Sequence, residues 1–243
     1  MKRIELVGPP GVGKTTLLNK VLIECKRNKI NTSRQLDIPI AYNIDGYYLF
    51  KFIYKFKNYL PSKIIGPANA YFSERFVRYE LENVSLDNKW SQLIDFYFTN
   101  LQKPSKHMKR IRQFNQSISI ASYVDRQNSD EIVLFDEGLF QRGFSLGYSE
   151  VEDEVLHKYY YYVPEPDLII FMYGSDSTLK KRLINRDGEN SEFTKLVKRS
   201  QDISKILLNV LKFRETNMVQ INTDDSLDKQ LEILIKKVQS LRN

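Results

Sequence analysis

The chain has 243 residues, of which 42% are hydrophobic and 28% charged, and this composition predicts a single globular domain of ordinary solubility. Its formal net charge of +7 is moderate, and the basic residues are mixed with acidic ones, which suits a site for several phosphate groups and does not by itself indicate nucleic acid. One cysteine, two histidines and the lack of a membrane-length apolar run exclude an internal disulfide, a zinc site and a membrane span. The first residues lead directly into a strand, so we expect a cytoplasmic protein without a signal peptide or a membrane partner.

The N-terminal segment is a predicted strand, loop and helix. Ile4, Leu6 and Val7 form the apolar run of a buried strand, and hydrophobic residues recur at helical spacing over 17–22. The segment between them fits the P-loop pattern G-x-x-x-x-G-K-[ST] at every fixed position and predicts a site for a nucleoside triphosphate. The residues expected to contact the nucleotide are Gly8, Pro9, Pro10, Gly11, Val12, Gly13, Lys14, Thr15 and Thr16.

Each residue type in this motif has a physical role. Glycines let backbone N–H groups turn toward phosphate oxygens, and the following helix adds the positive end of its dipole. Lys14 is long enough to reach the β- and γ-phosphates, and the Thr15 hydroxyl is suited to binding Mg²⁺. We therefore expect ATP and Mg²⁺ as cofactors.

Residues 37–116 carry no recognised motif. A weak strand pattern over 30–37 is followed by aromatic residues interleaved with Lys and Arg, several of them at helical spacing. Such a mixture binds single-stranded nucleic acid in some proteins, but long cations more often lie over an apolar core. We favour the core interpretation, with nucleic acid as the less favoured partner, and expect a helical insertion that binds a small-molecule acceptor.

The next predicted strand, residues 131–135, ends in two acidic residues. Its apolar run is followed by Asp136, Glu137 and Gly138, which is the arrangement of a Walker-B strand. A strand of this kind lies buried beside the P-loop strand and brings its acidic end to the metal. We therefore expect Asp136 and Thr15 to be the Mg²⁺ ligands.

The C-terminal part alternates strands and helices. An apolar run at 168–172 predicts a strand, and in the helix after it Arg182 and Arg186 are four residues apart and share one face. A turn-rich stretch then ends this helix, so we interpret about 176–191 as a lid. A long helix, a strand at 218–221 and a terminal amphipathic helix complete one domain that takes in the whole chain.

The order of these elements resembles the P-loop kinase family of nucleoside and nucleotide kinases, thymidylate kinase and the deoxynucleoside kinases among them. The resemblance covers roughly residues 1–36 and 117–242. It implies an α/β P-loop NTPase fold with a five-stranded, mostly parallel sheet and helices on both faces. It also implies a lid whose arginines close over the transferred phosphoryl group, and a loop around Asp224 that meets the adenine.

The resemblance further implies a kinase that transfers the γ-phosphoryl group of ATP to a nucleoside, a nucleotide or a similar acceptor. Family members have an Asp-Arg or Glu-Arg pair after the third strand, whereas here Asp136 is followed by Glu137, and the nearest arginine is Arg142. Glu137 would either accept the proton of an acceptor hydroxyl or orient Arg142. The expected catalytic residues are Lys14, Asp136, Glu137, Arg142, Arg182 and Arg186.

Other classes of function remain open. Residues 132–137 also fit an ATPase in which the glutamate after the Walker-B aspartate activates water, with hydrolysis coupled to a macromolecular partner. The basic aromatic insertion also fits an ATP-gated nucleic-acid binder. A GTPase is less favoured, because no Asn-Lys-x-Asp motif follows the fourth or fifth strand. No motif identifies the acceptor or the oligomeric state.

Overall fold

The structure, a computed structural model, describes residues 1–38, 74–82, 88–100, 108–148 and 151–241. Five strands form one sheet in the order β2-β3-β1-β4-β5, and each neighbouring pair is parallel. The strands are β1 (Lys2–Val7), β2 (Thr32–Arg34), β3 (Ile132–Phe135), β4 (Leu168–Tyr173) and β5 (Met218–Asn222). The predicted α/β P-loop fold with a five-stranded sheet is confirmed, and its strands are all parallel.

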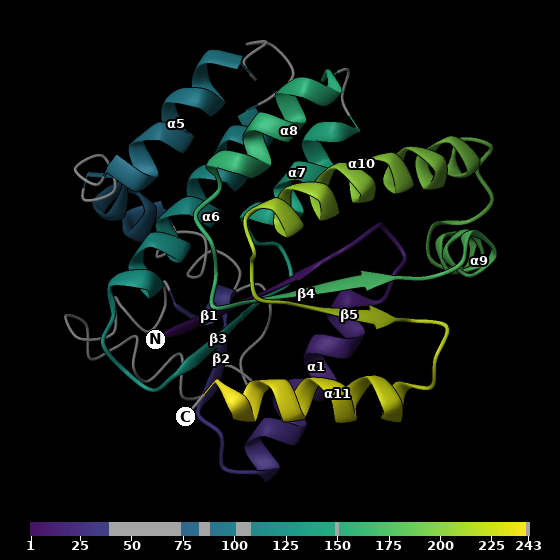
Figure 1. The fold of residues 1–243 in the computed structure, drawn as a ribbon, viewed down its shortest axis with the longest axis horizontal. Coiled ribbons are helices and arrows are strands. Elements are labelled where there is room, and N and C mark those ends of the chain that lie inside the picture. The colour runs from purple at the N-terminus through teal and green to yellow at the C-terminus, as the bar shows by residue number, and fades with distance from the viewer. Residues whose placement is uncertain (39–73, 83–87, 101–107, 149–150, 242–243) are drawn as a thin grey trace.

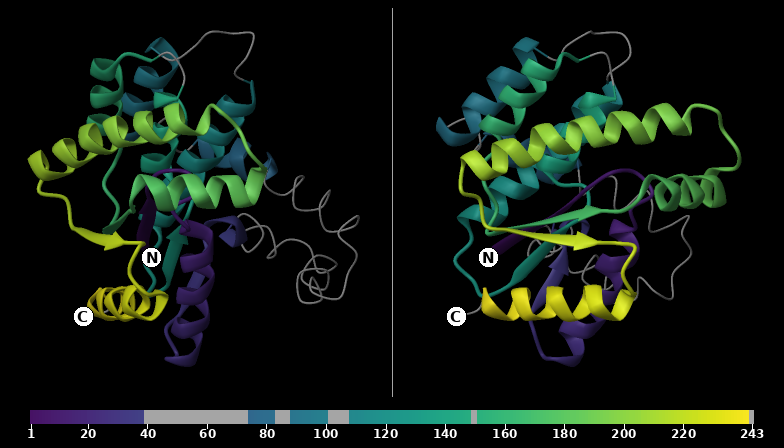
Figure 2. Two further views of the ribbon diagram at one scale, coloured as in Figure 1. Left: turned by 90° about the vertical axis from the view of Figure 1, so that its right-hand side faces the viewer. Right: turned by 45° about the vertical axis from the view of Figure 1, so that its right-hand side comes forward.

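Helices cover both faces of this sheet, as Figure 1 and the two views of Figure 2 show. On one face lie α1 (Lys14–Arg27) and α11 (Leu227–Ser240). α9 (Asp176–Asp187) follows the carboxyl end of β4. The helices of the opposite face are α5 (Asn88–Asn100), α6 (Met108–Arg126), α7 (Leu139–Gly147), α8 (Asp153–Tyr162) and α10 (Phe193–Phe213).

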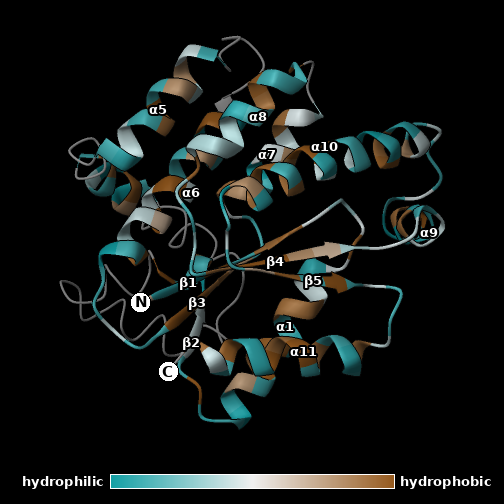
Figure 3. Ribbon diagram, in the orientation of Figure 1, coloured by the Kyte–Doolittle hydropathy of each residue, from teal (hydrophilic) through white to brown (hydrophobic). Residues whose placement is uncertain are grey.

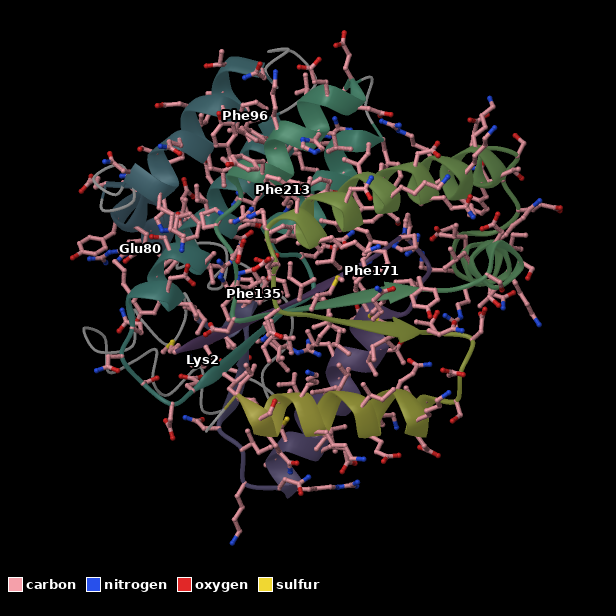
Figure 4. The ribbon with its side chains drawn as sticks, viewed as in Figure 1. Lys2, Glu80, Phe96, Phe135, Phe171 and Phe213 are labelled. Atoms are coloured by element: carbon pink, nitrogen blue, oxygen red, sulfur yellow. The ribbon has the colours of Figure 1, made fainter. Side chains whose placement is uncertain are left out.

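The alternation of side chains along β1 builds two cores, one on each face of the sheet. Ile4 and Leu6 join the cluster formed with α1 and α11, whereas Val7 joins the cluster formed with α5 to α8 and α10. Phe135 and Phe171, labelled in Figure 4, bring β3 and β4 into the second cluster. β3 and β4 are accordingly hydrophobic along most of their length (Figure 3). A parallel strand covered on both faces needs such continuous apolarity.

Most predicted elements are found close to their expected positions, but α7 was missed. The described parts of the expected insertion 37–116 are largely helical, including residues 74–82, and its aromatic stretch 47–59 lies outside the described residues. β2 is short, in line with its weak pattern, and the 3₁₀ helix η1 (Gln35–Asp37) follows it. In the part of the chain that the structure describes, no helix has both the length and the apolarity needed to cross a membrane.

Candidate active site

The P-loop connects the carboxyl end of β1 to the N-terminus of α1, and glycine is required at two of its positions. A Cβ at Gly8 would lie 2.3 Å from the carbonyl oxygen of Met172, so only glycine lets the loop pass this close to β4. Gly13 precedes α1 with φ of 97°, a left-handed conformation that side chains disfavour. The loop therefore delivers the N-terminus of α1, with its unpaired N–H groups, to the place where phosphate is expected.

Lys14 is folded back over this loop. Its Nζ donates hydrogen bonds to the carbonyl oxygens of Gly8 at 2.9 Å and Pro9 at 3.3 Å. Desolvation lowers the pKa of Lys14 to about 8, while the charges of Glu137 and Asp136 act in the opposite direction. These contacts place the ammonium group among the two acidic side chains and the loop backbone.

Thr15 and Asp136 meet at the end of the P-loop. The Thr15 hydroxyl donates a hydrogen bond to Oδ2 of Asp136 at 3.2 Å. Two oxygen ligands beside a phosphate site suit Mg²⁺, which keeps several waters and takes few ligands from the protein. Within the described ranges, no group of three or more His, Cys, Asp and Glu side chains could hold a metal by itself. The pair therefore fits a Mg²⁺ ion that is bound together with phosphates.

A cavity of about 740 Å³ lies over the P-loop. Its walls come from the loop and the start of α1, from α7, from α9 and from the segment after β5. Asp136 and Arg142 are not among the lining residues, but each is bonded to one of them, Asp136 to Thr15 and Arg142 to Glu137. Gly8 and Pro9 are buried beneath the cavity. The predicted catalytic residues that line it are Lys14, Glu137, Arg182 and Arg186.

Glu137 and Arg142 form an ion pair at one side of this cavity. The Arg142 guanidinium donates to Oε2 of Glu137 at 2.9 Å and, through Nε, to the hydroxyl of Ser117 at 3.1 Å. Ser117 in turn donates to the backbone carbonyl of Glu137 at 3.1 Å. Half of the Glu137 side chain remains exposed, compared with 12% of Arg142. The arginine is therefore the fixed member, and the carboxylate is the member that faces the cavity.

The two arginines of α9 line the same cavity but have different partners. Arg182 donates to the carbonyl of Val12 at 3.2 Å and to the hydroxyl and carbonyl oxygens of Thr223, so it ties the P-loop to the end of β5. Arg186 pairs with the adjacent Asp187 at 2.6 Å and is largely exposed. Its charge lies close enough to Lys14 to contribute to the lowered pKa of that lysine. The expected grouping of both arginines near the P-loop is thus present.

Asp224 lies beside this site rather than in it. Its carboxylate accepts the Ser175 N–H at 2.9 Å, and hydrogen bonds from Thr178 and Ser175 lower its pKa. The neighbouring residues Thr223 and Asp225 line the cavity, whereas Asp224 does not. The structure therefore places the Asp224 side chain against the turn between β4 and α9.

Sequence reasoning missed the contribution of α7. Gln141, Ser145 and Tyr148, on this helix and at its end, line the cavity, and Oε1 of Gln141 accepts the Gly8 N–H at 3.0 Å. The signal present in the sequence was the spacing of these polar residues, at intervals of four and three, which puts them on one helical face. Gln141 thus holds the first residue of the P-loop from outside the motif.

Comparisons with known proteins concern solved structures. No protein-family model and no curated protein matches the sequence. The chain is similar to three structures of deoxyadenosine kinase from M. mycoides, one with the products dCMP and a flexible dCDP, one with dATP and one with dCTP. Identities are 14%, 14% and 13% and TM-scores 0.49, 0.46 and 0.44, with 98% of this chain and 99% of each of those chains covered. At these values, the assignment of the fold rests on the sheet order and the P-loop geometry.

Proposed function

We propose that this protein is an ATP-dependent kinase that transfers the γ-phosphoryl group to a nucleoside, a nucleotide or a similar small acceptor. One observation carries the proposal: a P-loop lysine, a carboxylate and two arginines line one cavity of about 740 Å³, and Thr15, which also lines it, is hydrogen-bonded to Asp136. Phosphoryl transfer needs mainly positioning and charge neutralisation, and this set of groups supplies both.

Each of these residues has its own role in the proposed transfer. Lys14 leaves the P-loop carbonyls and pairs with phosphate oxygens, while Arg186, which is largely exposed beside the cavity, approaches the transferring group. Arg182 keeps the P-loop and the end of β5 together. Mg²⁺ held by Thr15 and Asp136 would neutralise charge on the β- and γ-phosphates.

Glu137 is the residue best placed to receive the proton of an acceptor hydroxyl. Its carboxylate is half exposed and is held by Arg142, so it is both accessible and oriented. A carboxylate in this position acts as the catalytic base that phosphoryl transfer to a hydroxyl requires. Of the two roles that the sequence left open for Glu137, the ion pair favours the first, because the more buried Arg142 orients Glu137 and not the reverse.

A second, small cavity of about 10 Å³, with room for about one water molecule, lies beside the first. It lies between α5, α6 and α7, and Ser145 lines both cavities. Its walls include Arg142, the amide of Gln113 and the stacked rings of Tyr97 and Phe114, whose centroids are 3.7 Å apart. Both rings are almost fully buried and belong to the hydrophobic core, so they form the floor of this part of the site.

The proposal is tested with γ-labelled ATP, Mg²⁺ and separate pools of nucleosides, nucleoside monophosphates, sugars and sugar phosphates. We expect label in one pool, and we expect none with Lys14→Ala. Label released only as inorganic phosphate, at the same rate with every pool, would contradict the kinase proposal and favour an ATPase. Hydrolysis stimulated by single-stranded nucleic acid, with steeply salt-dependent binding, would favour the nucleic-acid alternative.

A further inference from the structure

Two charged residues are buried in the central strand of the sheet. Arg3 and Glu5 on β1 have fully buried side chains, and the guanidinium donates to Oε1 of Glu5 at 2.5 Å. Arg3 also pairs with Asp125 of α6 at 2.9 Å and donates to the carbonyl oxygens of Pro164 and Glu165. Removing two charges from water costs free energy that offsets much of the gain from their attraction. A buried ion pair is therefore weak evidence that the pair serves to stabilise the fold. The contacts of the second carboxylate oxygen of Glu5 indicate a role other than stability.

The other oxygen of Glu5 caps α7. Oε2 accepts the N–H of Phe140 at 2.9 Å, in the first turn of the helix. A Cβ at Gly138, the residue before α7, would lie 2.4 Å from the same oxygen, so the carboxylate is packed tightly against the start of the helix. Burial raises the pKa of Glu5, while Arg3 and the Phe140 N–H oppose that shift. The first turn of α7 is therefore anchored to β1 through one side chain.

α7 connects the contact with Glu5 to the candidate active site. Gln141, the residue after Phe140, accepts the buried N–H of Gly8 at 3.0 Å. Arg142, the next residue, holds Glu137 at 2.9 Å. A continuous series of contacts thus leads from Glu5 through the start of α7 to both the P-loop and the carboxylate in the cavity.

We propose that Glu5 is a positioning residue for phosphoryl transfer, which sets α7 so that Gln141 fixes Gly8 and Arg142 orients Glu137. The proposal rests on the proposed function for its effect on transfer. Its effect on Gly8 does not depend on any activity. Arg3 assists by holding the carboxylate of Glu5 from the opposite side.

The matched variants are Glu5→Gln and Asp125→Asn, because each removes one carboxylate partner of Arg3. In Glu5→Gln, the new side-chain amide has one oxygen and turns N–H groups toward either Arg3 or Phe140, so one of the two contacts is lost. Asp125 has no hydrogen bond to α7 among the described residues. A purely structural role predicts similar losses of activity in both variants.

The first measurement is kcat and KM at a temperature where circular dichroism shows both variants to be folded. We expect Glu5→Gln to lower kcat by roughly tenfold or more, because small displacements of catalytic groups cost that much, and Asp125→Asn to stay within about twofold of the wild type. Equal losses of kcat in both variants, or a wild-type kcat in Glu5→Gln, would overturn the proposal.

The second measurement is amide hydrogen exchange at Gly8, which needs no turnover. Labelling with ¹⁵N-glycine and ¹³C-carbonyl valine selects glycines that follow valine, Gly8 and Gly13. We expect Glu5→Gln to speed exchange at Gly8 by about tenfold and to leave Gly13 unchanged, with no effect of Asp125→Asn at either position. Unchanged exchange at Gly8 in folded Glu5→Gln would overturn the positioning role, whereas a Gly8 response in a protein without transfer activity would overturn only the proposed function.

A second variant covers the case in which Glu5→Gln does not fold. Gly138→Ala keeps every charge but displaces the Glu5 carboxylate from the start of α7. We expect the same faster exchange at Gly8. Unchanged exchange there would overturn the proposal.

Discussion

At the scale of single residues, Lys14 is a proposed catalytic residue whose pKa is lowered. Desolvation lowers its pKa to about 8, so in the free protein the cation is present below this pH and is lost as the pH rises through it. We expect the association constant for ATP to fall above about pH 8 for this reason. Calorimetric titration on both sides of that pH measures the decline.

Lys14→Arg is the control for this prediction, because arginine stays charged over the whole range. We expect the variant to bind ATP more weakly than the wild type, but its association constant should not fall as the pH rises through about 8. The same decline in both proteins would assign it to another group.

The sequence predicts some of these residues and hides others, for a physical reason. Lys14, Thr15 and Asp136 stand in local patterns whose spacing is set by phosphate and metal geometry. From the sequence, Glu5 looks like an ordinary exposed charge on a strand. Its burial follows from the position of β1 between β3 and β4, which the sequence near Glu5 does not indicate. Gln141 likewise has no pattern of its own, because its partner is the backbone of Gly8, which lies 133 positions away.

At the scale of elements, α9 offers a test of the predicted lid. Arg182 is tied to Val12 and Thr223, so its removal also disturbs the P-loop, and Arg186 is the cleaner target. We expect Arg186→Ala to lower kcat by roughly 10³-fold, as for arginines that stabilise a transferring phosphoryl group, with a smaller change in ATP affinity. Steady-state kinetics and direct binding measure the two effects.

Lys181→Ala is the matched control on the same helix. Lys181 is exposed and does not line the cavity. We expect its kcat to stay close to that of the wild type. Similar rates for the two variants would show that α9 contributes only general positive charge.

α8 contains two adjacent buried tyrosines whose hydroxyl groups differ. The Tyr159 hydroxyl donates to the Leu139 carbonyl at 2.8 Å, whereas in the described part of the chain the Tyr160 hydroxyl has no hydrogen-bond partner. We expect Tyr159→Phe to cost about 1 kcal/mol and to lower Tm by roughly 2–4 °C. Tyr160→Phe should leave Tm unchanged or raise it, since an unpaired buried hydroxyl stabilises nothing. Thermal melting of the two variants side by side checks the contrast, and a larger loss for Tyr160→Phe would refute it.

The same packing explains why α7 escaped prediction. Glycine is a poor helix former, and this helix of nine residues contains both Gly143 and Gly147. A Cβ at Gly143 would come within 2.3 Å of the Tyr160 ring, and one at Gly147 within 2.7 Å of Ile203. Close approach to α8 and α10 therefore selects residues that weaken the helical pattern. By contrast, α11 shows a clear apolar face, because it packs with ordinary side chains.

At the scale of the whole molecule, the P-loop is continuous with the central strand of the sheet, so the proposed binding of ATP there should stabilise the entire fold. At an ATP concentration about 100 times its Kd, linkage adds about 2.7 kcal/mol, which corresponds to a rise in Tm of roughly 5–10 °C. We expect this rise in the wild type and in Lys181→Ala. Lys14→Ala should melt near the wild-type temperature without ATP and show little rise with it. An equal rise in Lys14→Ala would place the nucleotide elsewhere.

The central position of β1 also has a consequence for how the chain is made. Lys2 lies opposite Ile132, and Ile4 lies opposite Leu168, so both neighbours of this strand are encoded far downstream. At ordinary rates of protein synthesis, roughly 7–26 s pass on the ribosome before the first partner strand emerges. Throughout that interval, the apolar residues of β1 are a natural target for chaperones. The P-loop is thus translated well before the two strands that fix the position of β1.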